Sequence, residues 1–216
     1  MCFFKKMKKR NFGLIPSKMD GSEHIYFGNG MGPDNMPENY TYRRFLPDVL
    51  DQGQSYICVP CSVSAYLNWK ENLKDGSSKD NKVDYYEIYD IRPEKYDGMT
   101  FKDAFNYLRH HGVKSDAGVL KIKEYALVQS FLVLRLAILM NGPCVGALPV
   151  YNSRPDFWNK KTGDRLQGYH AVSIVGYNSN GFVIRNSWGE DFADGGYTEI
   201  PYEDFAKFLE VWTIMD

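Results

Sequence analysis

Apolar residues in the first half of the chain recur mainly at helical spacing. Residues 59–73 carry apolar side chains three and four positions apart, with polar side chains between them. Residues 99–112 carry a second stripe, formed by Phe101, Phe105 and Leu108 and closed by a glycine. The pattern therefore predicts two helices in this half.

In the second half the pattern shifts towards strands. Apolar runs rich in β-branched residues are separated by turn residues, and residues 178–181 join two runs as in a hairpin. Residues 131–141 keep helical spacing. We expect an α+β fold with a helical lobe over about residues 56–120, a β-rich lobe over about 121–216 and a ligand cleft between them. The predicted strands are 125–128, 144–151, 170–177, 181–185, 197–201 and 210–215.

Residues 1–45 are expected to form an N-terminal extension. Turn-forming residues dominate positions 27–37, so we expect this part to run extended over the surface and to cover the ligand site. The first ten residues include five basic ones, which indicates a solvated tail. No apolar stretch follows them, so we expect no secretion signal, and residues 126–140 are too short and too polar to span a membrane.

Composition and charge narrow the class of protein. The 216 residues fit one domain or two compact halves, and 15% aromatic residues argue against disorder. A net charge of −1 gives no bulk attraction for nucleic acid. The chain has four cysteines, of which Cys58 and Cys61 are three positions apart and the other two are scattered. A disulfide-rich secreted scaffold carries far more cysteines for its length. The four cysteines indicate either a reducing compartment or a cysteine with a chemical role.

Cys58 has the sequence setting of an activated thiol. The predicted helix begins beside it, and Pro60 suits a first helical turn because its missing N–H is no loss there. Unpaired N–H groups and the helix dipole stabilise a thiolate at such a position. We therefore expect the pKa of Cys58 to lie below that of a free thiol. Cys61 lies one turn further along the helix.

Two later segments supply the partners that a nucleophilic thiol needs. His170 opens a predicted strand, and an imidazole within reach would take the thiol proton and return it to a leaving group. Asn186 follows the next predicted strand, and an amide bonded to the other ring nitrogen would fix the tautomer of the imidazole. Gln52, six residues before Cys58, is placed to form an oxyanion hole with the Cys58 N–H.

In order and spacing these segments resemble the papain-like (C1-type) cysteine peptidases. The resemblance rests on Gln52-Gly53 with Cys58 six residues after the glutamine, on the stretch starting at His170, and on Asn186-Ser187-Trp188-Gly189. It covers about residues 46–216. It implies a two-lobed fold, with a helical lobe, an antiparallel sheet or barrel lobe and the active site between them. It also implies peptide hydrolysis by a Cys58, His170 and Asn186 mechanism.

Two more positions are implied by the same resemblance. Asp97 to Ala104 looks like the glycine segment and following helix of the substrate cleft in bacterial and phage members, which makes Gly98 the residue that pairs with the substrate backbone. Trp188 shields the contact between His170 and Asn186 from water. The sequence departs from the family around the nucleophile, where Cys58-Val59-Pro60-Cys61 replaces the usual Cys-Gly-Ser-Cys-Trp. Only 51 residues precede Gln52, so a long propeptide is not expected.

Three alternatives stay open at this level. The nucleophile is Cys61 if the alignment slips by one helical turn. The chain is a catalytically silent binding or structural subunit, for instance in a virion, if its cleft is occluded. The Cys58 to Cys61 pair is a redox motif if the protein is a thiol oxidoreductase. A zinc site would need two more ligands than the sequence offers, so we expect no metal and no other cofactor.

For partners, the sequence predicts a peptide or protein substrate and neither nucleic acid nor a membrane. The expected location is the cytoplasm or a virus particle.

Overall fold

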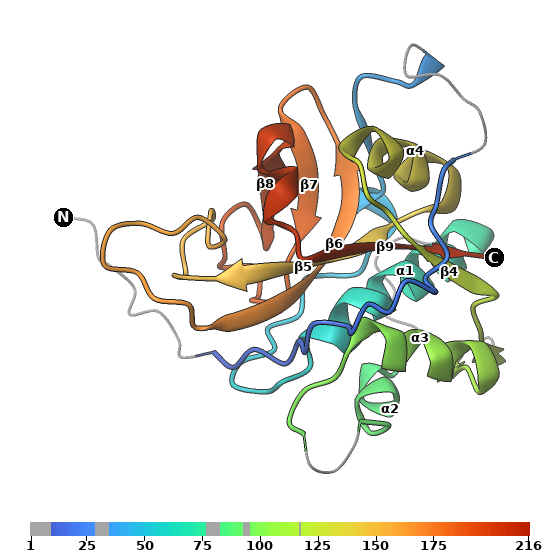
Figure 1. The fold of residues 1–216 in the computed structure, drawn as a ribbon. Helices are drawn as coiled ribbons and strands as arrows, with labels where there is room; N and C mark the ends of the chain where they lie inside the picture. Colours follow the sequence, from blue (N-terminus) through green and yellow to red (C-terminus); the bar gives the residue numbers. More distant parts are fainter. Residues whose placement is uncertain (1–9, 29–34, 77–82, 93–95, 117) are drawn as a thin grey trace.

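The computed structural model describes residues 10–28, 35–76, 83–92, 96–116 and 118–216. Figure 1 shows two lobes, one mainly helical and one built on a sheet. Helix α1 (Cys58–Asp75) lies between the sheet and the two helices α2 and α3, and α4 packs on the sheet lobe. The predicted α+β class is confirmed. In the described part of the chain no helix is long and apolar enough to cross a membrane.

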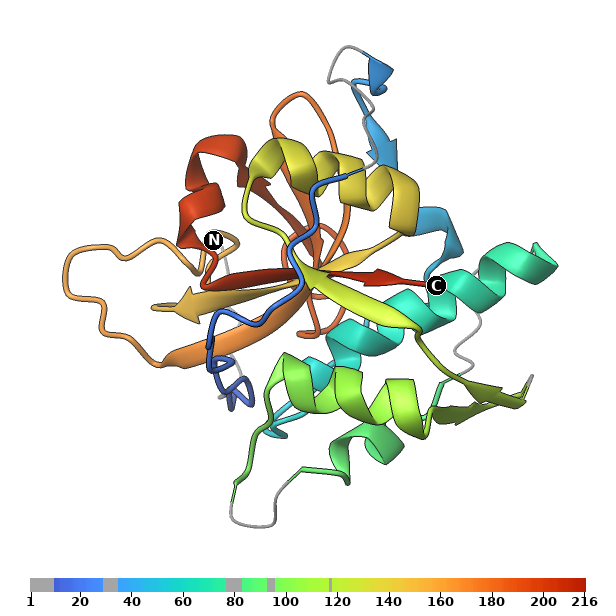
Figure 2. The same cartoon turned by 45° about the vertical axis from the view of Figure 1, so that its right-hand side comes forward.

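The helical lobe is arranged around one long helix. This helix contacts strand β6 of the sheet on one side and the shorter helices α2 and α3 on the other (Figure 2). The helix has Pro60 in its first turn and ends at Gly76, which has φ of 69°, a left-handed conformation that glycine adopts without strain. The elements of this lobe are α1 (Cys58–Asp75), α2 (Tyr85–Tyr89), α3 (Phe101–His110), β2 (Val113–Ser115) and β3 (Gly118–Leu120).

The second lobe is an antiparallel sheet with the strand order β4-β9-β5-β6-β7-β8, in which β1 pairs with the edge of β6. The helix α4 packs against β9, β5 and β6. Two short 3-10 segments, η2 (Arg43–Phe45) and η3 (Tyr202–Lys207), complete it. The elements are β1 (Tyr40–Thr41), β4 (Glu124–Leu127), α4 (Phe131–Asn141), β5 (Cys144–Val150), β6 (Gly168–Tyr177), β7 (Gly181–Arg185), β8 (Tyr197–Pro201) and β9 (Glu210–Met215).

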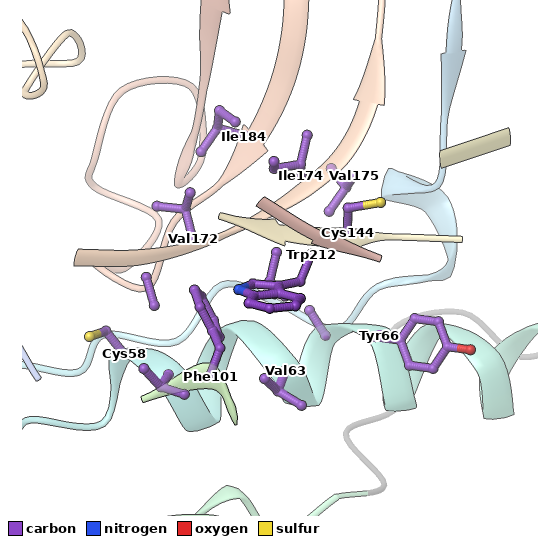
Figure 3. Close-up of a cluster of buried hydrophobic side chains, with 14 of the residues drawn as sticks. Cys58, Val63, Tyr66, Phe101, Cys144, Val172, Ile174, Val175, Ile184 and Trp212 are labelled. Carbon is purple, nitrogen blue, oxygen red and sulfur yellow. The ribbon is translucent and has the colours of Figure 1, made fainter. Parts of the chain in front are cut away.

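The core lies where α1 meets β6 and its neighbours. Figure 3 shows Val63 of α1 facing Trp212 of β9, with Val172 of β6 above the start of the helix. Trp212 and Val63 are fully buried, and Val172 is almost so. Burial of aliphatic and aromatic side chains on this scale stabilises the pairing of the two lobes, since each contributes about 1.5–3 kcal/mol. This packing fixes the start of α1 against β6.

Most elements begin and end close to the predicted residues. The predicted helix at 59–73 is observed as Cys58–Asp75, and the one at 99–112 as Phe101–His110. Each predicted strand is present within two residues of its expected ends. The pattern missed α2 and the hairpin of β2 and β3, which are too short to establish a period. The predicted basic tail lies almost entirely outside the described residues.

Part of the predicted extension belongs to the sheet. The strand β1 lies within residues 1–45, and it pairs Tyr40 with Tyr177 and Thr41 with Gly176 of β6. Further towards the N-terminus the chain is extended, with single bridges from Leu14 to Met99 and from Ile25 to Leu127. It therefore runs from the helical lobe to the sheet lobe, beside α3 and β4 (Figures 1 and 2).

Candidate active site

Cys58 is the first residue of α1. The first helical hydrogen bond of α1 joins Cys61 N–H to the carbonyl of Ile57 at 2.9 Å, so the N–H groups before it have no partner within the helix. The thiol is completely buried. The backbone N–H of Ala171, the residue after His170, lies near enough to the sulfur to lower its pKa. The structure thus brings Cys58 to the strand that carries His170.

His170 and Asn186 are joined across adjacent strands. His170 lies in β6 and Asn186 directly follows β7, and the two strands are paired antiparallel. His170 Nε2 lies 2.8 Å from Asn186 Oδ1, and both residues are buried. The same oxygen accepts a hydrogen bond of 2.7 Å from Ser187 N–H, so it is the acceptor and His170 Nε2 is the donor. Nδ1 of the imidazole then carries the lone pair.

Aromatic rings close the site around the imidazole. Trp188 stacks on His170 with 4.9 Å between ring centroids and 30° between planes. Phe157, from the loop between β5 and β6, lies 4.8 Å from Trp188 and 5.8 Å from His170. Among the described residues His170 Nδ1 is buried without a hydrogen-bond partner. The ring is therefore held in one orientation, with its basic nitrogen kept from water.

Burial favours the neutral forms of Cys58 and His170 in this conformation. Desolvation raises the pKa of the Cys58 thiol, and neighbouring backbone N–H groups offset this only in part. Desolvation also lowers the pKa of His170 to about 4, assisted by the positive charge of Arg10 and opposed by the Asn186 hydrogen bond. The expected low pKa of Cys58 is wrong for this conformation, because water is excluded from the site and helix position alone does not compensate.

Gln52 has both ends of its side-chain amide occupied. Nε2 donates to the carbonyls of Asn11 at 2.9 Å and Ser55 at 3.1 Å. Oε1 accepts from the Ser187 hydroxyl at 2.6 Å. The side chain is buried, with 5% exposure. The donor that the sequence assigned to an oxyanion thus contacts a carbonyl oxygen from the N-terminal segment.

Residues 10–15, here called the strap, occupy the cleft between the lobes. Met99 N–H donates to the Gly13 carbonyl at 2.9 Å, and Ile15 N–H donates to the Met99 carbonyl at 3.0 Å. Gly98, predicted to pair with substrate, lies so close that a Cβ there would be 2.2 Å from the Gly13 carbonyl oxygen. The strap therefore uses the backbone edge at Gly98 and Met99 that the sequence assigned to the substrate.

The other end of the strap is fixed by Arg10. Its guanidinium donates to Asp51 Oδ1 at 2.6 Å and to the Trp188 carbonyl at 2.8 Å, and lies 5.3 Å from the centre of the Trp188 ring. Next along the strap, Phe12 packs edge-on against His170 with 6.1 Å between centroids. Together these contacts hold the strap across the imidazole.

The strap presents N–H groups to the Cys58 sulfur, and the carbonyl of Gly13 points elsewhere. The backbone N–H groups of Gly13 and Leu14 lie near enough to the Cys58 sulfur to lower its pKa slightly. The Gly13 carbonyl is turned away, towards Met99. A thiolate attacks a carbonyl carbon, so the strap is held in the cleft in a geometry that does not make it a substrate.

Four residues of the site were missed from the sequence: Arg10, Phe12, Phe157 and Ser187. The first two lie in a segment without periodic pattern, and Phe157 lies in a loop, so no local signal marks them. Ser187 does stand next to Asn186 in a quoted motif. Its neighbour in the fold, Gln52, lies 135 residues away in sequence. The bridge between Asp51 and Trp188 and the bond from Gln52 N–H to the Ser187 carbonyl bring the two loops together.

Comparison with protein families gives one matching model. The model described as "Papain family cysteine protease" matches residues 69–207. This range includes His170 and Asn186, and it leaves Gln52 and Cys58 outside.

Curated proteins give a consistent result. "Cathepsin B-like CP3" of Giardia intestinalis is 35% identical over 212 residues, covering 78% of this chain and 69% of that protein. "Cysteine proteinase 3" of Entamoeba histolytica is 29% identical, covering 74% of this chain and 61% of that protein. The match to "Cathepsin B-like cysteine proteinase 1" of Haemonchus contortus is 35% identical but spans only 24% of that protein.

Solved structures share the fold over nearly the whole chain. Xylellain, a cysteine protease from Xylella fastidiosa, superposes with a TM-score of 0.79 at 24% identity, covering 99% of both chains. A procathepsin B from Trypanosoma congolense superposes with a TM-score of 0.73 at 13% identity, covering 94% of this chain and 85% of the other. The predicted two-lobed fold is thereby confirmed.

Proposed function

Since this chain belongs to the papain family of cysteine proteases, we propose that it is itself a cysteine peptidase whose nucleophile is Cys58. His170 serves as base and then as acid, Asn186 orients His170, and Gln52 stabilises the oxyanion. The substrate class is a peptide or a protein. The observation that carries this assignment is the buried pair of His170 and Asn186, whose free Nδ1 lies on the strand that contacts the Cys58 sulfur.

The mechanism follows from the atoms that these residues offer. Nδ1 of His170 takes the proton of the Cys58 thiol, and the sulfur attacks the carbonyl carbon of the scissile bond. The negative charge on the carbonyl oxygen is stabilised by Gln52 Nε2 and the Cys58 N–H at the start of α1. His170 then protonates the leaving amine, and water hydrolyses the acyl-enzyme with His170 as base.

Asn186 and Trp188 serve this mechanism without touching the substrate. Asn186 Oδ1 accepts the Nε2 proton, which leaves Nδ1 as the basic atom towards the thiol. Trp188 is 1% exposed and stacks on the imidazole, so it keeps water from the hydrogen bond between His170 and Asn186. A hydrogen bond in such a setting holds the ring more firmly than it would in water.

In this proposal the described conformation is a latent form. The strap covers Cys58, occupies the donor of Gln52 and pairs with Met99, so a substrate enters only after residues 10–15 leave the cleft. Burial also favours the neutral thiol of Cys58, which is a weaker nucleophile than the thiolate. Release of the strap hydrates the site, and the helix dipole of α1 then favours the thiolate.

The occluded cleft favours one other function. A catalytically silent subunit would keep its cleft filled permanently, and the strap contacts are compatible with that role. The two functions differ in what happens when the strap is displaced. A latent peptidase gains activity, and a silent subunit gains none.

Displacement of the strap by one substitution tests the proposal. A Cβ at Gly13 would lie 1.8 Å from the Tyr56 carbonyl oxygen, so Gly13→Ala forces the strap away from α1. We expect Gly13→Ala to hydrolyse fluorescently quenched casein faster than the wild type. Lys18→Ala, at an exposed position just beyond the strap, is the matched control and should leave the rate unchanged.

The nucleophile is tested in the same background. Cys58→Ala combined with Gly13→Ala should abolish hydrolysis, and Cys61→Ala combined with Gly13→Ala should retain it. Folding of every variant is checked by circular dichroism. If folded Gly13→Ala protein had no activity on casein, the silent-subunit function would replace the peptidase. If the Cys61 variant were inactive instead, the nucleophile would be Cys61.

A further inference from the structure

The proposed mechanism uses Cys58 and leaves Cys61 unexplained. The two cysteines enclose Val59 and Pro60 at the start of α1, and both are free thiols in this structure. Cys61 is partly buried and takes no part in the contacts of His170, Asn186 or Gln52 described above. A second thiol three residues from a nucleophile on the same helix has a chemical consequence of its own.

Helix geometry places the two thiols close together. Cys58 and Cys61 are the first and fourth residues of α1, and side chains three apart on a helix have Cβ atoms about 5–6 Å apart on one face. In a disulfide the Cβ atoms are about 3.5–4.5 Å apart. The two Cβ atoms must therefore approach by about 1–2 Å, which needs a rotation within the first turn of α1 and no rearrangement of the fold.

Both thiols also face the same strand. The backbone N–H of Ala171 in β6 lies near enough to the Cys58 sulfur to lower its pKa, and Cys61 lines a small cavity together with Ala171, Ser173 and Arg185. Figure 3 shows Cys58 at the first turn of α1 and Val172 of β6 above it, on the sheet side of the helix. The two sulfurs thus share the interface between α1 and β6.

The first turn of α1 permits the required rotation. The N–H groups of Cys58 and Val59 make no bond within the helix, Pro60 has no N–H, and no side chain caps the turn. The first intrahelical bond is made by Cys61 N–H to Ile57. Cys58 can therefore turn towards Cys61 without loss of a helical hydrogen bond.

The charges around Cys61 favour its thiolate once water has access. Burial and the neighbouring thiol raise the pKa of Cys61 in the closed conformation, while the positive charge of Arg185 lowers it. Arg185 lies at the end of β7 and lines the same cavity. The helix N-terminus adds a further positive potential. These groups stabilise either sulfur as the thiolate in an exchange reaction.

We propose that Cys61 is a resolving thiol that forms a reversible disulfide with Cys58 and thereby switches the peptidase off. The loss of peptidase activity in this inference rests on the proposed function, whereas formation of the disulfide does not depend on catalysis. The disulfide makes residues 58–61 a modification site. While it is formed the enzyme is inactive, and the Cys58 sulfur is protected from irreversible oxidation.

The oxidant in this proposal is a small-molecule disulfide such as oxidised glutathione. With the strap released, the Cys58 thiolate attacks one sulfur of the disulfide, forms a mixed disulfide and releases one small thiolate. The Cys61 thiolate then attacks the Cys58 sulfur and releases the second. In sum the two protein thiols lose two electrons and two protons, and the small-molecule disulfide is reduced to two thiols. A dithiol reductant reverses both steps.

The test follows the two sulfurs by mass. The wild type and Gly13→Ala are each incubated with oxidised glutathione. The incubation time is the time in which a parallel sample of the same protein is completely alkylated at Cys58. The Cys58 thiol is therefore known to be accessible during the incubation. The proteins are then alkylated and cleaved with trypsin. The tryptic peptide of residues 45–70 contains Cys58 and Cys61 and no other cysteine, so an internal disulfide makes it two hydrogen atoms lighter and blocks both alkylations.

We expect this disulfide peptide in both proteins, with loss of casein hydrolysis in proportion to it and recovery with dithiothreitol. In Cys61→Ser the exchange should stop at a glutathione adduct on Cys58. Cys144→Ser is the matched control, because Cys144 is a buried thiol in β5, and it should behave as the wild type.

A wild-type peptide that keeps glutathione on Cys58 with an alkylated Cys61 would overturn the proposal, and so would a peptide with both cysteines alkylated. The two proposals fail in different ways. Without peptidase activity the reduced protein hydrolyses nothing, yet the mass of the peptide still decides whether the disulfide forms. Without the disulfide the reduced protein is active and the peptide stays unbridged.

Discussion

Ser187 joins two groups of the proposed mechanism. Its hydroxyl donates to Gln52 Oε1 at 2.6 Å, and this bond orients the amide whose Nε2 donates to the Asn11 carbonyl. Its N–H donates to Asn186 Oδ1 at 2.7 Å. We expect Ser187→Ala to lower kcat with little change in KM, by less than the ~10²–10³-fold typical for loss of an oxyanion donor. The measurement is steady-state kinetics in the Gly13→Ala background.

Measurements in the Gln52→Ala background show whether Ser187 acts by positioning Gln52 or whether its substitution disturbs the structure of the site. If Ser187 acts through Gln52, Ser187→Ala should have little further effect on kcat once Gln52 is alanine. Ser179→Ala, at an exposed serine in the turn after β6, is the matched control. Equal losses of kcat in both backgrounds would show that Ser187 does not act through Gln52.

His170 makes the stability of the closed form depend on pH. Burial lowers its pKa from 6.5 to about 4, so between these values the unfolded chain binds a proton that the folded chain does not. The neutral imidazole therefore contributes stability above pH 6.5, and this contribution of about 3 kcal/mol is lost as the pH falls towards 4. Acid should weaken the closed form.

The comparison of wild type with His170→Asn measures this contribution. Other titrating groups are the same in both proteins, so they cancel in the difference. Between pH 7 and pH 5 the free energy of unfolding by urea should fall more steeply in the wild type than in the variant. Parallel pH profiles would mean that His170 is not buried as a neutral ring in the folded protein.

At the residue scale the sequence was sufficient for chemistry that is local and insufficient for contacts across the fold. Cys58, His170 and Asn186 each stand at the end of a predicted element, so residue type and position together suggested their roles. The pKa of Cys58 was expected to fall and instead rises, because burial by the strap outweighs the position at the helix start. Burial of that kind depends on a segment more than 40 residues away.

At the scale of elements, prediction succeeded where a period extends over several turns or residue pairs. The helix α4 was predicted with the observed ends, since Ser130 caps its start and Gly142 closes it. The helix α2 has only five residues and follows residues outside the described part, so its pattern is too short to establish a helix. The strand β1 has two residues, and it is a strand only because β6 offers it an edge.

The start of α3 is held by a capping box that also fixes the cleft edge. The Thr100 hydroxyl accepts from Asp103 N–H, and the Asp103 carboxylate accepts from Thr100 N–H. Met99, which pairs with the strap, directly precedes this cap. We expect Thr100→Ala to lower the free energy of unfolding by about 1 kcal/mol, as is typical for loss of an N-cap.

Urea denaturation measures the Thr100→Ala effect. Thr162→Ala, at an exposed loop position, is the control and should leave the midpoint unchanged. Because the cap positions Met99, casein hydrolysis by full-length Thr100→Ala should also rise as the strap loosens. An unchanged midpoint would indicate that the packing of Phe101 and Phe105 alone determines where α3 begins.

At the scale of the whole molecule the strap determines whether the two lobes present an open cleft. Arg10 joins the strap to both sides, because it bonds Asp51 before α1 and the Trp188 carbonyl after β7. We expect Arg10→Ala to raise casein hydrolysis by the full-length protein. In the Gly13→Ala background it should have no further effect, since the strap is already displaced there.

Arg10→Lys is the informative second variant. A lysine keeps the charge but cannot make the two bonds at once, so hydrolysis should rise nearly as much as with alanine. Full latency in the lysine variant would assign the role of Arg10 to charge alone. An unchanged rate in Arg10→Ala would show that the contacts of Leu14 and Met99 hold the strap without it.

The two-lobed architecture was predictable, and the course of the strap was not. The change from helical to strand period divides the chain near residue 120, and the order of the motifs indicates the family. Residues 10–15 carry no periodic pattern, and their conformation is set by bonds to Met99, Gln52 and Asp51, which lie far along the chain. Their position thus depends on the completed fold.

The most direct test of the account is the site of covalent labelling by a peptidyl epoxide that alkylates activated thiols. Gly13→Ala should take up one equivalent, found by mass on Cys58 within the peptide of residues 45–70, and full-length wild type should react more slowly. His170→Ala in the same background should react far more slowly, because the thiol then lacks its base. Labelling of Cys61, or equal rates with and without His170, would contradict the proposed nucleophile and its activation.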